Sequence, residues 1–142
     1  MKIKTYDLSK VSHIPWDEYE FCRNNNFSKN RKSDIPGAES SMKVWLEECL
    51  DNAKGNLFIA FNEKNMVGWA ISYKAWDNNT EFQIYVPPRQ RRKGIGTLIL
   101  ETACNLVGKV RVFSHEVSEP FYRLHGLSHK GNISGKKIKK KI

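Results

Sequence analysis

The stretch at residues 81–100, EFQIYVPPRQRRKGIGTLIL, limits the fold of this 142-residue chain more than any other. Its first six residues alternate in character, which predicts a strand with two different faces. One face carries Phe82, Ile84 and Val86, and the other carries Glu81, Gln83 and Tyr85. Two prolines follow, and proline has no N–H to donate to a neighbouring strand. The strand is therefore expected to end at Val86.

A helix is expected to begin shortly after this strand. From Lys93 onward, apolar side chains recur at helical spacing and form one stripe: Ile95, Leu98, Ile99, Thr102 through its methyl group, and Leu106. Gly108 is expected to end the helix. The turn between strand and helix holds basic residues and two glycines, Gly94 and Gly96. Such a turn suits a phosphate, because backbone N–H groups and the positive end of the helix dipole both favour an anion.

The rest of the chain supplies further strands and helices in a readable order. We expect strands at residues 2–8, 56–61, 66–73 and 109–115, with a weaker one at 127–134. We expect helices at 15–25, with Pro15 in the first helical position, at 38–53 before Gly55, and at 118–126. Strands adjacent in sequence, followed by a strand–helix–strand unit, predict a mixed sheet covered by helices. The fold class is therefore α/β (α+β), in one domain at residues 1–134 with a basic tail at 135–142.

Charge and cysteine content narrow the class of protein. The net charge is +9, and five lysines lie in the last seven residues. Cys22, Cys49 and Cys104 are odd in number and far apart, which argues against a zinc site or a disulfide framework. We therefore expect a cytoplasmic protein without a metal. No apolar run reaches the ~18 residues that a membrane span needs, so no membrane partner is expected.

Three kinds of phosphate-binding loop can be compared with the basic turn. The P-loop pattern G-x-x-x-x-G-K-[ST] does not occur. The dinucleotide pattern G-x-G-x-x-G begins at Gly94 but has Ile99 in place of its third glycine, which would oppose close packing of helix and strand. The third pattern, R-x-x-G-x-G, is present from Arg91 to Gly96. In this position the turn resembles the coenzyme A site of the GNAT family of N-acetyltransferases.

Further segments are similar to that family. The segment FYRLHGL, with Tyr122, Gly126 and Leu127, resembles its Y-x-x-x-G-F element, and the predicted hairpin at 56–73 resembles its early hairpin. The resemblance implies a mixed, mostly antiparallel sheet with helices on both faces. It also implies acetyl-CoA as a co-substrate, and it allows a homodimer.

The resemblance assigns roles to individual residues of this chain. It implies that Tyr122 is the acid that protonates the departing thiolate, and that the N–H of about Val86 stabilises the oxyanion. Glu81 is one candidate for the base that deprotonates the amine, and a chain of waters is the other. His115 stands where the family often has asparagine. The residues expected to contact the cofactor are Tyr85, Val86, Arg91, Arg92, Lys93, Gly94, Ile95, Gly96, Thr97 and His115.

Two functions from different classes follow. In the first, the chain is an enzyme that moves an acetyl group from acetyl-CoA to an amine by direct attack in a ternary complex. Cys104 has no activating base near it in the sequence, which argues against an acyl-cysteine. The acceptor is open; a protein lysine, an aminoacyl-tRNA or another nucleic-acid-associated amine would suit the positive charge. In the alternative, the chain is a non-catalytic binding module whose basic turn and tail hold nucleic acid or an acidic protein.

Overall fold

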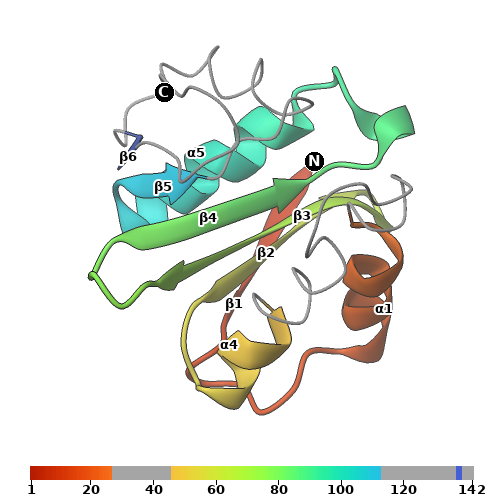
Figure 1. The fold of residues 1–142 in the computed structure, drawn as a ribbon. Helices are drawn as coiled ribbons and strands as arrows, with labels where there is room; N and C mark the ends of the chain where they lie inside the picture. The colour runs from red at the N-terminus through yellow and green to blue at the C-terminus, as the bar shows by residue number, and fades with distance from the viewer. Residues whose placement is uncertain (27–45, 113–136, 139–142) are drawn as a thin grey trace, which may run out of the picture.

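The computed structural model describes residues 1–26, 46–112 and 137–138, which build a mixed sheet with helices on both faces (Figure 1). The strands are β1 (Lys2–Asp7), β2 (Asn56–Asn62), β3 (Asn65–Lys74), β4 (Thr80–Tyr85), β5 (Val110–Val112) and β6 (Lys137–Ile138). The helices are α1 (Trp16–Asn24), α4 (Glu48–Asp51), α5 (Ile95–Val107) and the short 3₁₀ helix η2 (Pro88–Gln90).

The strands of this sheet lie side by side in chain order, from β1 to β6. Neighbouring strands are antiparallel except for β4 and β5, which run parallel. A parallel pair needs a crossover, and α5 supplies it. The expectation of a mixed, mostly antiparallel sheet is confirmed.

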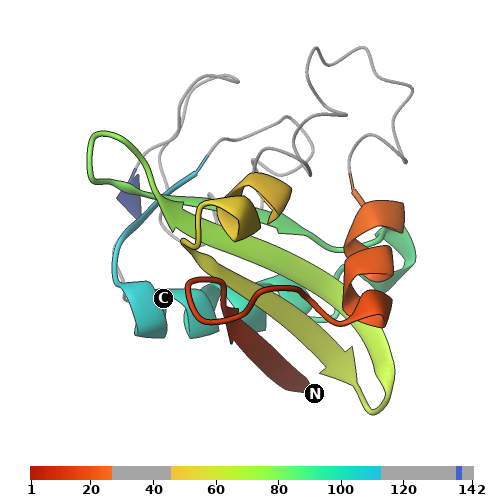
Figure 2. The ribbon, with the colours of Figure 1, turned by 90° about the horizontal axis from the view of Figure 1, so that it is seen from below.

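The two faces of the sheet carry separate hydrophobic cores. The core on one face joins α5 to the sheet through Phe58, Phe82, Ile95, Ile99 and Leu100. The core on the other face contains α1 and α4, which contribute the buried Cys22 and Cys49. Figure 2 shows α4 and α5 on opposite sides of the sheet. Both faces are therefore covered, as the resemblance implies.

The alternation predicted for β4 is confirmed. Phe82 and Ile84 belong to the core beneath α5, and Val86 packs against the same core. Tyr85 belongs to the core on the other face. Glu81 and Gln83 are also buried, with 4% and 5% of their surface exposed. This strand therefore places polar side chains in the interior, on the face away from α5.

The helix after the basic turn is present, but its buried face differs from the predicted stripe. The buried residues of α5 are Ile95, Ile99, Leu100, Ala103 and Cys104. Leu106, which was expected on the buried face, is 56% exposed. The difference arises because the small side chains of Ala103 and Cys104 let the helix lie close to the sheet, so the helix turns them inward. The predicted stripe contained Ile95 and Ile99 correctly, but it left out Leu100, Ala103 and Cys104.

Other boundaries differ in detail. Pro15 is the N-cap of α1 and not its first helical residue. The expected helix at 38–53 is described only from Leu46, and its α-helical part is α4. Lys137 and Ile138 lie in the predicted tail, yet they pair with β5 as β6. The expected helix at 118–126 and strand at 127–134 lie outside the described residues.

No helix in the described ranges is long and apolar enough to span a membrane.

Candidate functional site

The basic turn joins the end of β4 to the start of α5 through two residues with left-handed backbone. Arg92 has φ +62° and Gly94 has φ +81°. Gly94 is the N-cap of α5 and provides no side-chain bond to the first N–H groups of the helix. A Cβ added at Gly94 would meet nothing within 4 Å, so the space beside the helix start is open. The start of α5 at Gly94 therefore borders open space, as an anion site at a helix N-terminus requires.

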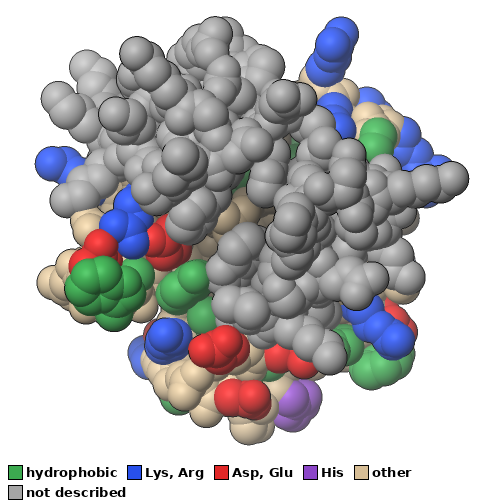
Figure 3. Space-filling view, in the orientation of Figure 1, with side chains coloured by type: hydrophobic (Ala, Val, Ile, Leu, Met, Phe, Trp, Pro, Cys, Tyr) green, Lys and Arg blue, Asp and Glu red, His purple; other side chains and the backbone are tan. Residues whose placement is uncertain are grey.

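Positive side chains surround this helix start. Arg89, Arg92 and Lys93 are exposed. Lys and Arg side chains gather over the turn at the upper right of Figure 3. Lys93 Nζ lies 3.4 Å from Gln90 Oε1, within the turn itself. Several positive charges on one short turn favour the binding of a multiply charged anion.

Arg91 behaves differently from its basic neighbours. Its Nε donates a hydrogen bond to the carbonyl oxygen of Val86 at 2.7 Å. Its guanidinium carbon lies 5.6 Å from the centre of the Tyr85 ring, which is cation–π distance. Burial raises the pKa of the Tyr85 phenol, so this ring is neutral at ordinary pH. The side chain of Arg91 thus turns back onto the end of β4.

The end of β4 and the start of α5 meet over Gly68 of β3. A Cβ on Gly68 would lie 3.1 Å from Ile95 Cγ2, 3.2 Å from Ile99 Cδ1 and 3.3 Å from Val86 Cγ2. The missing side chain therefore lets the first turn of α5 seat against the sheet. Gly68 lies within the hairpin predicted at 56–73, but its packing role depends on which helix crosses it.

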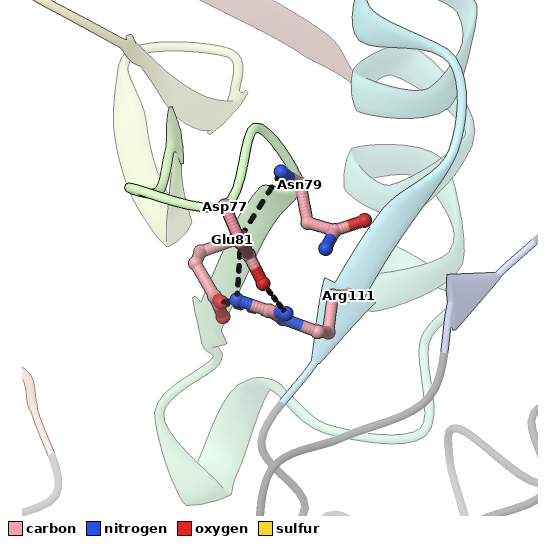
Figure 4. A network of polar contacts seen from close by, with 4 residues as sticks. All are labelled: Asp77, Asn79, Glu81 and Arg111. Atoms are coloured by element: carbon pink, nitrogen blue, oxygen red, sulfur yellow. Dashed lines mark hydrogen bonds and ion pairs between the residues drawn. The ribbon is translucent and has the colours of Figure 1, made fainter.

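Glu81, the candidate base, lies at the opposite end of β4 in a polar network (Figure 4). Arg111 of β5 donates from Nε to Glu81 Oε1 at 2.6 Å, and its Nη2 donates to the same oxygen. Arg111 also donates from Nη1 to Asp77 Oδ2 at 2.5 Å. The Arg111 guanidinium, with a further bond from Asn79, lowers the pKa of the Asp77 carboxyl to about 2. The network fastens the β3–β4 turn and β4 to β5.

Two polar atoms on this part of β4 have no hydrogen-bond partner among the described residues. They are Glu81 Oε2 and Gln83 Nε2, and both are buried. Nothing in the sequence marks Arg111 as the partner of Glu81, because that pairing depends on the register of the parallel strands. For Gln83, the alternation of β4 was the one sequence signal that it shares a face with Glu81.

The remaining predicted residues divide into two groups. The structure brings Tyr85, Val86 and the residues from Arg91 to Thr97 together around the turn. Tyr122 and His115 lie outside the described residues. In the described part of the chain, no group of three His, Cys, Asp or Glu side chains could hold a metal.

Comparison with known proteins decides the family. Residues 9–127 match the model of the acetyltransferase (GNAT) family. The chain belongs to the GNAT acetyltransferase family. A comparison with curated protein sequences gave no match.

Solved structures of GNAT proteins share the fold. The PaiA N-acetyltransferase of Thermoplasma acidophilum, in complex with coenzyme A, has a TM-score of 0.69 and 16% identity, covering 98% of this chain and 99% of its own. A protein of Desulfovibrio desulfuricans described as a GNAT-family acetyltransferase has a TM-score of 0.66 and 13% identity, covering 92% and 87%. A Bacillus anthracis acetyltransferase in complex with acetyl coenzyme A has a TM-score of 0.54 and 18% identity, covering 64% and 57%. At 13–18% identity, these matches show that the chain shares the fold of these proteins.

Proposed function

We propose that this protein binds acetyl-CoA at the basic turn and transfers its acetyl group to an amine. The observation that carries the proposal is the start of α5, where a left-handed Gly94 opens an uncapped helix beside exposed basic side chains. The family match supports the activity. The complexes of two structural relatives with coenzyme A and acetyl coenzyme A support the choice of ligand.

The turn would hold the pyrophosphate with backbone N–H groups and positive side chains. Gly94, Ile95 and Gly96 would present their N–H groups at the start of the helix. Arg92 and Lys93 are exposed beside them and would neutralise phosphate charge. Ile95, Arg92 and Lys93 have side chains large enough to block the approach of the pyrophosphate. Ile95 is buried in the core, whereas Arg92 and Lys93 are exposed to solvent.

Val86 would stabilise the oxyanion that forms when the amine attacks the thioester. The next two residues are prolines, which have no N–H. Val86 directly follows β4, and its N–H is therefore the last backbone donor before the two prolines and η2. A backbone donor fixed at a strand end needs no reorganisation during the reaction.

The structure favours a water chain over direct proton transfer to Glu81. Val86 lies five positions beyond Glu81, which corresponds to about 17 Å along a strand at about 3.3 Å per residue. A base acts within one hydrogen bond, or through one water, of the proton it takes. Glu81 Oε1 is also occupied by Arg111. We therefore propose that several waters carry the proton away from the amine, and that Tyr122 protonates the departing thiolate.

Direct attack by the amine is favoured over a covalent acyl-cysteine. All three cysteines are buried. Burial raises the pKa of the Cys104 thiol, which lies on α5 after the turn, to about 11. A thiol that stays protonated at neutral pH is a poor nucleophile.

Calorimetric titration with acetyl-CoA tests the proposal. The unmodified protein is expected to bind, and Gly96→Glu is expected to abolish binding, because a carboxylate at the start of α5 would block and repel the pyrophosphate. In an assay with a lysine peptide and an aminoacyl-tRNA as acceptors, Tyr122→Phe should lower kcat and leave acetyl-CoA affinity nearly unchanged. If Tyr122→Phe is fully active, Tyr122 is not the acid that protonates the thiolate.

The exposed basic cluster favours one other function, the binding of nucleic acid without catalysis. Titration with a short RNA at two salt concentrations separates the two. Salt-sensitive RNA binding together with no acetyl-CoA binding would favour the binding module. Acetyl-CoA binding that depends on Gly96 would favour the enzyme.

A further inference from the structure

We infer that Arg91 is a positioning residue that fixes the end of β4 around the acyl group, and is not a ligand of the pyrophosphate. The inference rests on the proposed acetyl-CoA site. It divides the basic turn into an inward residue, Arg91, and outward residues, of which Arg92 is the nearest.

Arg91 contacts the groups that come before and after the N–H of Val86 along the chain. The guanidinium lies over the ring of Tyr85, the residue before this N–H. Arg91 Nε donates to the carbonyl oxygen of Val86, the group after it. The two residues next to the proposed oxyanion donor are thus held by one side chain.

The end of β4 needs such a contact because its own sequence weakens it. Strand β4 ends at Tyr85, so Val86 lies beyond the ladder with β3. Pro87 and Pro88 cannot donate hydrogen bonds to extend that ladder. Arg91 satisfies the carbonyl of Val86 where the sheet does not. A donor misplaced by a fraction of its bond length would lose much of its effect on the oxyanion.

Arg92 provides the contrast within the same turn. Its backbone is left-handed, with φ +62°. Its side chain is exposed, whereas that of Arg91 is half-buried. Arg92 is therefore available to a phosphate.

Two variants of Arg91 separate a positioning role from phosphate binding, because one keeps only the charge and the other keeps only a planar N–H donor. Arg91→Lys keeps the positive charge and loses the planar guanidinium that donates at Nε and covers the ring. Arg91→Gln keeps a planar N–H donor and loses the charge. Arg92→Gln is the matched variant at the outward position. Melting temperature and calorimetric titration with CoA are measured first for each protein.

The decisive assay compares two acetyl donors with the acceptor that the unmodified protein uses. S-Acetylpantetheine lacks the pyrophosphate, and acetyl-CoA carries it. We expect Arg91→Lys to lower kcat about tenfold or more, by a similar factor with both donors. The KM for acetyl-CoA should change little. Arg91→Gln should retain more activity than Arg91→Lys with S-acetylpantetheine. Arg92→Gln should lose activity with acetyl-CoA but not with S-acetylpantetheine.

The opposite pattern would overturn the inference. If Arg91→Lys is as active as the unmodified protein, or if variants at Arg91 raise only the KM for acetyl-CoA, then Arg91 is a phosphate ligand or a bystander. If Arg91→Lys does not fold, the comparison of Arg91→Gln with Arg92→Gln on the two donors still decides. Failure of the unmodified protein to bind CoA would instead count against the proposed function.

Discussion

At the scale of single residues, Gly68 sets how closely α5 approaches the sheet. Gly68→Ala would place a methyl group 3.1–3.3 Å from Ile95, Ile99 and Val86, so these side chains must move by a few tenths of an ångström. We expect the free energy of unfolding to fall by about 1–3 kcal/mol, as for other overpacked sites. We also expect weaker CoA binding, because Ile95 begins α5 and Val86 directly follows β4. Urea unfolding and calorimetry measure the two effects.

Gly108→Ala is the control for this prediction. Gly108 has φ +83°, and a Cβ there would meet nothing within 4 Å. Its cost should come from the backbone alone, which has φ +83° and ψ −130° and is sparsely populated by residues other than glycine, at about 1–3 kcal/mol. A protein with Gly108→Ala should lose stability and keep its CoA affinity. Equal loss of CoA affinity in both variants would contradict a specific role for Gly68.

Asp77 makes a pH-dependent contribution to stability. Arg111 holds the pKa of the folded carboxyl at about 2, below the value near 4 expected in the unfolded chain. A depressed pKa means that the stabilisation is complete above about pH 4 and is lost as the pH falls toward 2. Urea midpoints measured across this range should fall more steeply for the unmodified protein than for Asp77→Asn. Parallel acid limbs for the two proteins would contradict the assignment.

At the scale of elements, Arg111 joins β5 to β4. The parallel pairing in the described residues comprises only Glu81 with Arg111 and Phe82 with Val112. Arg111→Met would leave the buried Glu81 carboxylate without its cation. We expect a loss of about 2–3 kcal/mol, below the ~3–5 kcal/mol of fully buried pairs, because the Arg111 side chain keeps 19% exposure.

A double-mutant cycle tests this coupling. The cycle adds Glu81→Gln to Arg111→Met, which removes the buried negative charge of Glu81 as well as its cation. The double variant should be more stable in urea than Arg111→Met alone. If the two losses simply add, Glu81 and Arg111 do not depend on each other.

Elements with strong local signals could be predicted from the sequence, and their relative placement could not. The alternation of β4, the two prolines and Gly94 fixed the strand, the turn and the start of α5, because each acts within a few residues. The rotation of α5 escaped prediction, since it depends on how Ala103 and Cys104 meet the sheet. The partner of Glu81 escaped for a similar reason, because the register of a parallel pair is set by distant residues.

At the scale of the whole molecule, ligand binding should be visible as stability. Acetyl-CoA that binds only the folded chain should stabilise it by about 2.7 kcal/mol at a concentration one hundred times its Kd. A thermal melt of the unmodified protein should move upward with acetyl-CoA, and that of Gly96→Glu should not. A shift of the same size in Gly96→Glu would place the ligand somewhere other than the basic turn.

Among the described strands, β1 lies at the edge of the sheet, which has a consequence for the newly made chain. β1 is completed by β2, and Asp7 pairs with Asn56. A ribosome adding about 5–20 residues per second needs on the order of several seconds to make the chain between them. During that interval the first strand has emerged without its partner and is a template for pairing with another chain. Lys2 and Lys4 lie on this strand, and their charges discourage such pairing until β2 arrives.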